Sequence, residues 1–349
     1  MAEYAVDDEI LAFFEKTTAT RSQCERRARQ LTGSDKIEPV SIQGDCSYTM
    51  YAGDHLEFVV QCRLRSLALK ASMTDLATTI HGSLAPVVSL HGELGHRQEQ
   101  GDGKEPLLVY LMTSMPGITQ LNFVLSRTVK QSSPDLFPLR QIFFADVASF
   151  FAQSWLAPQN ASSEYRDTLR AGYLGDLQAL HKGLPERFKP AVDTCLRALD
   201  SIMALPMVLL HKDFGSCNLL VDKDLCHLTG VIDWAEALIG PFGTNLHSVQ
   251  AFAGSMHLRN GWSTFPDYHP LEQRFWATLS AEVGGLSEEM VTTIKEARLL
   301  GLLLSHGFTS RLANEGAPVP LKDDEHGRYH MMFLDGYLVN LSTKRADSL

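Results

Sequence analysis

The sequence predicts an α+β protein with two lobes, a small β-rich N-terminal lobe and a larger helical C-terminal lobe. Strand-like runs separated by turn residues dominate the first ~110 residues. After Met115-Pro116-Gly117, long segments with helical periodicity take over, and one β-rich hairpin at 208–237 interrupts them. A chain of 349 residues also suits about two domains. We therefore expect a first lobe over residues 1–112 and a second over residues 113–349.

The first lobe should begin with a helix over Asp7–Arg29, where apolar residues recur at helical spacing. Two β-rich runs joined by Gly53-Asp54 predict a hairpin. The polar segment 94–106 should be an exposed loop. The remaining elements are expected, in order, as strand 37–42, a strand-like run 43–51, strand 58–63, helix 72–82, and strands 84–94 and 107–112.

The second lobe should be mainly helical. Around the hairpin, helical periodicity predicts helices at 121–128, 139–156, 165–181, 188–204, 271–283 and 288–312, and a further helical run within 321–343.

Composition limits the class of protein. The net charge of −10 argues against a nucleic-acid or anionic-membrane binder, because such partners need basic surface. The first residues lack the pattern of a secretory signal, and the apolar run Leu299–Leu304 is far shorter than the roughly 20 residues of a membrane span. None of the six cysteines forms a C-x-x-C pair. We expect a cytoplasmic protein with reduced thiols; its oligomeric state is open.

The chemistry is concentrated in the hairpin. Asp213 stands in a short loop between two apolar runs, with His211 before it and Asn218 after it. A carboxylate there can accept a hydroxyl proton, and the amide oxygen of Asn218 suits magnesium. Asp233 ends the run Gly230-Val231-Ile232 and can present a second metal ligand from a rigid edge. Taken singly, each of these residues could instead be a turn or strand-end residue.

Two neighbouring features need separate interpretations. Asp213-Phe214-Gly215 spells D-F-G, but the acid expected to bind metal is Asp233, in a D-W context. His211 is expected to hold the loop rather than to react. Glu236 either supports the metal site or is a solvated carboxylate.

The residues HKDFGSCNLLVD from His211 to Asp222, followed by GVIDW from Gly230 to Trp234, resemble the aminoglycoside phosphotransferase/choline kinase-like family. That family typically shows H-G-D-[LF]-x-x-x-N-[IVL]-[IL]-V-D and then G-[VI]-I-D-[WF]. In particular, the chain resembles fungal-type members of the phosphotransferase enzyme family. The strong match covers the motif, and Lys212 departs from the usual glycine.

This resemblance implies a protein-kinase-like fold, ATP with Mg²⁺ as cofactors, and a small-molecule acceptor as partner. It implies Asp213 as the catalytic base, and Asn218 and Asp233 as magnesium ligands.

The first lobe matches this family less well. Gly44 and Ser47 fall where a turn should cover the nucleotide phosphates. Gln61 stands where the family has a phosphate-anchoring lysine. Arg63, two residues on, could reach back to the phosphates or could be a surface residue. The family also has a partner glutamate for that lysine on the following helix, where this chain has Asp75 as its one acid. Ser72-Met73-Thr74-Asp75 fits a helix-capping pattern equally well.

Residues 108–112 followed by Met115-Pro116-Gly117 resemble the linker between kinase lobes. Backbone groups from Tyr110 through Met112 to Thr113 would then bind adenine; a plain buried strand is the alternative.

The sequence thus predicts an aminoglycoside phosphotransferase-like small-molecule kinase that acts on a hydroxyl, or less readily on an amine. Because Gln61 carries no charge, two alternatives stay open: a pseudokinase-like binding protein, and an enzyme repurposed within a biosynthetic pathway. The acceptor should lie against 245–262 and 303–311. The first of these segments contains no acidic residue, which favours a neutral or anionic acceptor.

Overall fold

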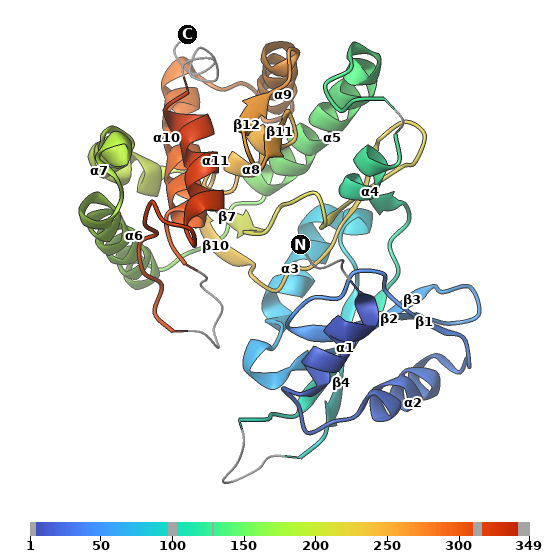
Figure 1. Cartoon of the computed structure of the whole chain (residues 1–349). Helices are drawn as coiled ribbons and strands as arrows, with labels where there is room; N and C mark the ends of the chain where they lie inside the picture. The colour runs from blue at the N-terminus through green and yellow to red at the C-terminus, as the bar shows by residue number, and fades with distance from the viewer. Residues whose placement is uncertain (1–4, 97–102, 128, 310–315, 341–349) are drawn as a thin grey trace. The chain divides into compact units, whose positions relative to one another are not determined.

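Figure 1 shows the computed structural model of the chain. The structure describes residues 5–96, 103–127, 129–309 and 316–340. Its contacts divide the chain into two compact units, the first reaching Pro116 and the second beginning at Gly117.

The first unit contains a five-stranded antiparallel sheet in the spatial order β1-β2-β3-β5-β4. The strands are β1 Ile37–Pro39, β2 Ser47–Ala52, β3 Phe58–Leu64, β4 Val88–Leu94 and β5 Leu107–Thr113. The helices are α1 Val6–Phe14, α2 Arg21–Thr32 and α3 Ala71–His81. Ala52 pairs with Phe58 across the turn at Gly53-Asp54, which confirms the predicted hairpin.

The core of this unit joins one face of the sheet to the first two helices. Met50 of β2 and Val60 of β3 are fully buried in one cluster with Ile10 of α1 and Cys24 of α2. Because side chains alternate along a strand, the residues between them point to the other face of the sheet.

The helix predicted over Asp7–Arg29 is two helices. α1 ends at Phe14, and α2 begins after Thr20. The Thr20 hydroxyl accepts the Gln23 N–H, while the Gln23 side chain accepts the Thr20 N–H. This capping box starts a second helix, a signal that apolar spacing alone does not reveal.

α3 begins one residue before its prediction, so the proposed capping role of Asp75 is wrong. Its N-cap is Lys70, which makes no side-chain capping bond. Ser72 lies inside the first turn and Asp75 is an exposed residue beyond it.

The second unit is mainly helical. Its helices are α4 Gln120–Leu125, α5 Phe137–Leu156, α6 Ser163–Gly183, α7 Lys189–Ala204, α8 His247–Ala251, α9 Tyr268–Glu282, α10 Glu288–His306 and α11 Arg328–Leu338. Its strands are β6 Ile118–Thr119, β7 Met207–Leu210, β8 Leu219–Val221, β9 Leu228–Val231, β10 Leu238–Pro241, β11 Gly254–His257 and β12 Gly261–Thr264. β6, β8 and β9 form one sheet, while β7 pairs with β10 and β11 with β12.

α5 forms the aromatic centre of this unit. Four of its phenylalanines are buried: Phe143, Phe144, Phe150 and Phe151. α5 packs against α9, and α7 packs against both α6 and α10; Figure 1 shows α6 and α7 side by side. A helix with apolar residues on several sides is expected to be surrounded by protein, as α5 is.

The sequence patterns do not predict β10, β11 or β12. Each has four residues, and each exists through pairing with a partner strand rather than through a long alternating pattern. The predicted helix 288–312 ends at His306, and residues 310–312 lie outside the described residues, as does the end of the predicted acceptor segment 303–311. Residues 341–343, at the end of the last predicted helical run, also lie outside the described residues.

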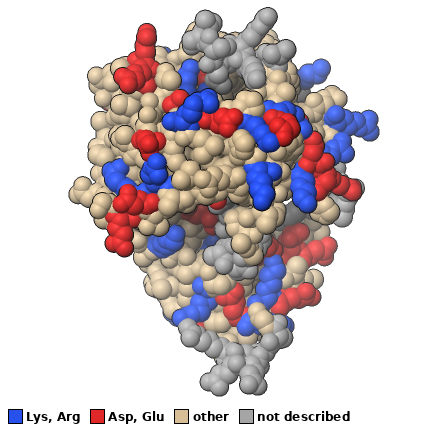
Figure 2. All heavy atoms as spheres, turned by 90° about the vertical axis from the view of Figure 1, so that its left-hand side faces the viewer, with Lys and Arg blue, Asp and Glu red and all other residues tan. Residues whose placement is uncertain are grey.

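On the face shown in Figure 2, Lys and Arg side chains are interspersed with Asp and Glu, and no large area carries charge of one sign. In the described part of the chain, no helix has the length and apolarity needed to cross a bilayer.

Candidate active site

The loop after β7 is anchored by Phe214. This side chain is buried, and its ring packs 5.2 Å from that of Phe150 and 4.9 Å from that of Phe151. Asp213, the residue before it, is exposed. The phenylalanine thus fixes the loop in the aromatic centre while the carboxylate stays accessible.

Asn218 holds the Asp213 carboxylate. Its Nδ2 donates to the main-chain oxygen of Asp213 at 2.9 Å and to Oδ2 at 2.8 Å. Because the amide nitrogen is used in this way, Oδ1 of Asn218 is the atom available to a cation.

Ile232 ties the loop to the segment that carries Asp233. The Ile232 N–H donates to the main-chain oxygen of Asn218 at 2.9 Å. The Ile232 oxygen in turn accepts from Nε2 of His211 at 2.8 Å. β8 and β9 continue the connection, since Leu219 pairs with Val231. These bonds link the loop that carries Asp213 and Asn218 to the segment that carries Asp233, 20 residues after Asp213.

His211 is a buried residue that supports this loop. It is 1 % exposed, and its ring lies 4.7 Å from that of Trp234. Burial lowers its pKa, although the Ile232 carbonyl and the charges of Asp213 and Asp233 act in the opposite direction. The expected holding role of His211 fits this environment.

Lys212 and Asp233 both have left-handed backbone conformations, with φ of 67° and 61°. The Asp213 N–H donates to the His211 oxygen at 2.9 Å, which closes a γ-turn around Lys212. Glycine adopts such a conformation without steric cost, so the lysine at this position holds a strained backbone.

The residues of the first unit that were predicted to lie near the nucleotide phosphates are in or beside β2 and β3. Ser47 pairs with Arg63 and Thr49 with Gln61. The Gln61 Nε2 donates to the Thr49 Oγ1 at 3.3 Å, and its Oε1 is buried without a hydrogen-bond partner among the described residues. Ser47 is buried, and its hydroxyl lies 3.3 Å from that of Thr49.

Arg63 is buried, so the alternative that it is a surface residue is wrong. It is 4 % exposed, and its Nε donates to the Leu67 oxygen in the turn that follows β3. Its guanidinium group is thus used within the first unit.

Gly44 is exposed in the loop between β1 and β2. A Cβ there would meet no atom within 4 Å, and its φ is not in the left-handed region, so no local feature requires glycine. The neighbouring Gln43 shapes this loop instead. Its side chain bonds the main chain of Val40 and Thr49.

The predicted backbone contact to adenine from Tyr110 to Thr113 conflicts with the sheet. β5 is paired with β3 on one edge and with β4 on the other, and this pairing includes Tyr110 and Met112. Strand pairing therefore already uses their backbone groups. Tyr110 is buried, its hydroxyl accepts the Leu69 N–H at 3.0 Å, and Met112 is half-buried.

Some supporting residues have no clear sequence signal. The first turn of α4 is bonded to the loop, because the Leu121 N–H donates to the Ser216 oxygen at 3.0 Å. Phe150 and Phe151 look like ordinary core residues in the sequence. Gly117 is the one residue near this contact whose type hints at the structure. Its φ is 107°, and a Cβ added there would lie 2.6 Å from the main-chain oxygen of Val221.

Comparison with known proteins identifies the family. The model of the phosphotransferase enzyme family matches residues 51–277, about two thirds of the chain. The chain belongs to this family.

One solved structure supports the fold, and a second is reported beside it. The apoenzyme of macrolide 2′-phosphotransferase MphH from Brachybacterium faecium is 16% identical, with a TM-score of 0.51, over 82% of this chain and 90% of that one. The streptomycin–ATP–APH(2″)-IIa ternary complex is 14% identical, with a TM-score of 0.49, over 84% and 93%. A search of curated proteins found no match.

The phosphotransferase has the two-part α+β architecture of a kinase-like fold, as predicted. The prediction of a small-molecule kinase of the aminoglycoside phosphotransferase type is also confirmed. The matched range includes all of the motif from His211 to Trp234.

Proposed function

We propose that this phosphotransferase moves the γ-phosphoryl group of ATP to a hydroxyl group of a small molecule, with Mg²⁺ as cofactor. The observation that supports this most is the pair of hydrogen bonds from Asn218 to Asp213, with Asp233 directly after Ile232, whose N–H donates to the main-chain oxygen of Asn218. Asp213 accepts the hydroxyl proton as the acceptor oxygen bonds to phosphorus. The bond to the β-phosphate oxygen breaks, and its electron pair leaves with ADP.

The donor set fits Mg²⁺. One carboxylate from Asp233 and the free amide oxygen of Asn218 are hard oxygen ligands, and Mg²⁺ typically combines one or two carboxylates with substrate phosphates. Among the described residues there is no group of three or more His, Cys, Asp or Glu side chains that could hold a metal. A set of one carboxylate, one amide and the phosphates does not require such a group. When bound, the ion neutralises charge on the phosphates.

For the acceptor we propose a neutral or anionic molecule. Residues 243–266 contain no Asp or Glu, and Lys212 stands directly before Asp213. The predicted acceptor wall at 245–262 divides into two environments. Asn245 and His247 are buried, while His257 and Arg259 are at the exposed tip of the β11–β12 hairpin.

A second candidate is a nucleotide-binding protein that does not transfer phosphate. Gln61 is neutral, and Arg63 donates to the Leu67 oxygen. Anchoring of the nucleotide phosphates would then depend on the metal and on backbone groups.

One experiment separates these functions. ATP turnover is measured with a panel of hydroxylated small molecules, and thermal unfolding is followed with ATP in the presence and absence of Mg²⁺. Asp213→Asn should reduce turnover at least about 100-fold, because it removes the general base. It should keep the magnesium-dependent thermal shift, which Asp233→Asn should abolish.

Asp224→Asn, in the exposed turn after β8, is the matched control and should behave like the parent. Full activity of Asp213→Asn would refute the assignment. A magnesium-dependent shift without turnover on any acceptor would favour the binding protein.

A further inference from the structure

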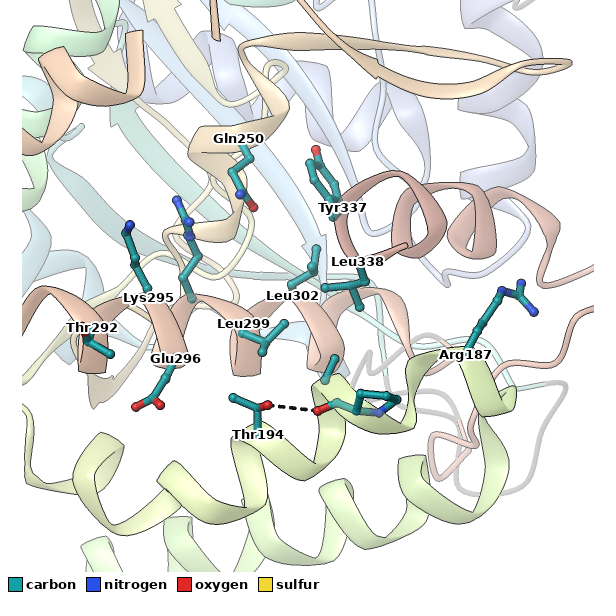
Figure 3. Close-up of a pocket in the computed structure, with 13 residues that line it drawn as sticks. Arg187, Thr194, Gln250, Thr292, Lys295, Glu296, Leu299, Leu302, Tyr337 and Leu338 are labelled. Carbon is teal, nitrogen blue, oxygen red and sulfur yellow. Dashed lines mark hydrogen bonds between the residues drawn. The ribbon is translucent and has the colours of Figure 1, made fainter. Parts of the chain in front are cut away.

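The second unit contains a cavity of about 550 Å³ that the proposed reaction does not use. It lies between α7, α8, α10 and α11 (Figure 3). Its lining includes no residue from 207–241, so it is separate from the motif. The residues around it are Arg187, Pro190, Ala191, Thr194, Gln250, Thr292, Lys295, Glu296, Arg298, Leu299, Leu302, Tyr337 and Leu338. Its volume falls within the range of small-molecule sites, roughly 300–1,000 Å³.

One part of the wall is apolar. Leu299 and Leu302 come from α10 and Leu338 from the end of α11, and Figure 3 shows these three side chains close together. Leu302 is 3 % exposed, while Leu299 and Leu338 are half-buried. An apolar ligand body placed here would remove their exposed surface from water.

The positive charges around the cavity differ in their partners. Arg187 is ion-paired with Asp323 and Asp335, and Arg298 with Glu272. Lys295 has no carboxylate within ion-pair distance among the described residues. Its ammonium group lies 6.0 Å from the centre of the Trp276 ring.

The single acidic side chain of the lining faces away from this lysine. In Figure 3, Lys295 and Glu296 leave opposite sides of α10, and Gln250 lies on the Lys295 side. Burial raises the pKa of Glu296, and the nearby charge of Arg197 acts in the opposite direction. An anion at Lys295 would therefore not meet this carboxylate directly.

A buried hydroxyl also lacks a partner. Tyr337 is 8 % exposed, and its hydroxyl has no hydrogen bond within the described part of the chain. This hydroxyl oxygen is enclosed by protein, and in Figure 3 it points away from the three leucines, so a ligand against them does not reach it. The cavity thus combines an apolar wall with an ammonium group that has no carboxylate partner among the described residues.

We propose that this cavity binds a small amphipathic anion, with its apolar body against Leu299, Leu302 and Leu338 and its anionic group beside Lys295. The site is independent of the proposed phosphoryl transfer. Binding there requires neither ATP nor an acceptor.

Isothermal titration calorimetry with decanoate tests the proposal. The parent protein should bind one decanoate per chain. Decyltrimethylammonium, whose main chain also has ten carbon atoms but whose head is cationic, should bind at least about tenfold more weakly. Lys295→Met should weaken decanoate binding about tenfold, since a hydrogen bond to a charged group is lost. Leu299→Trp should abolish binding by filling the cavity.

Lys182→Met is the matched control, because Lys182 is exposed on α6 and does not line the cavity. It should bind decanoate like the parent, and thermal unfolding should show that all variants are folded. The proposal is wrong if decanoate does not bind, or if Leu299→Trp leaves binding intact. It is also wrong if Lys295→Met and Lys182→Met behave alike, or if the cationic probe binds equally well.

Discussion

Two residues of the candidate active site hold backbone conformations that side chains usually avoid. Lys212 has φ 67° directly before Asp213, and Asp233 has φ 61°. In the family pattern, glycine usually occupies the position of Lys212. The γ-turn aims Asp213 away from the core that Phe214 enters, so the strain lies where the geometry of the carboxylate is set.

The strain at Lys212 predicts a stability difference between two variants. Lys212→Gly should be more stable than Lys212→Ala by about 1 kcal/mol, because both remove the charged side chain but only glycine lacks the Cβ that clashes at positive φ. Urea unfolding of the two proteins provides the measurement. Equal stability of the pair would show that the turn relaxes without strain.

At the scale of elements, the close approach of α10 to the segment before α8 shapes the second unit. A Cβ on Gly301 of α10 would lie 1.6 Å from the Thr244 oxygen and 3.0 Å from Nδ1 of His247. Glycine is therefore required sterically in the middle of a helix, where it is otherwise unfavourable. The same main-chain oxygen of Thr244 accepts the Nδ1–H of His247 at 3.1 Å, which holds the imidazole beside α10.

Two helix-interior glycines should respond in opposite ways to alanine. Gly301→Ala should destabilise the protein by about 3 kcal/mol, because the backbone of α10 or of Thr244 must move. Gly175→Ala in α6 should stabilise it by about 1 kcal/mol, since a Cβ there meets no atom within 4 Å and alanine favours helix. Chemical denaturation compares both with the parent. A neutral Gly301→Ala would contradict the close packing.

At the scale of the whole molecule, buried histidines couple stability to pH. Burial, followed by the nearby charge of Lys212, lowers the pKa of His247 to about 4. Burial, with His247 and His330 as neighbours, lowers the pKa of His306 to about 3. Both start from 6.5, so the unfolded chain takes up protons first as the pH falls. Stability should therefore decrease from about pH 6.5 downward.

The His247 contribution can be measured. Between pH 7.5 and pH 5, the parent should lose about 2 kcal/mol of unfolding free energy through this residue. In His247→Asn, which keeps a donor toward Thr244, the loss over the same interval should be smaller by that amount. Unfolding curves at both pH values provide the test within each protein, so a general destabilisation of the variant cancels. His326→Asn, at an exposed position, is the control; an unchanged loss in His247→Asn would contradict the prediction.

Much of the architecture follows from local patterns. The long helices α5, α6, α7, α9 and α10 and the β2–β3 hairpin carry their own periodicity and turn residues. Local patterns fail where another element provides the stabilisation. β10, β11 and β12 need a pairing partner, and the break between α1 and α2 depends on one capping interaction.

The sequence by itself determined the chemistry of the motif: which carboxylates and which amide are present, in the order and spacing that match the phosphotransferase enzyme family. Only the tertiary structure decided how they are held. Asn218 bonds Asp213, and Ile232 joins His211 to the strand before Asp233, because backbone groups distant in sequence meet there. It also decided that the buried Arg63 donates a hydrogen bond to the main-chain oxygen of Leu67. Tyr110 lies in a strand that is paired on both edges. Burial and pairing depend on contacts between elements, and residue types at fixed spacing do not contain that information.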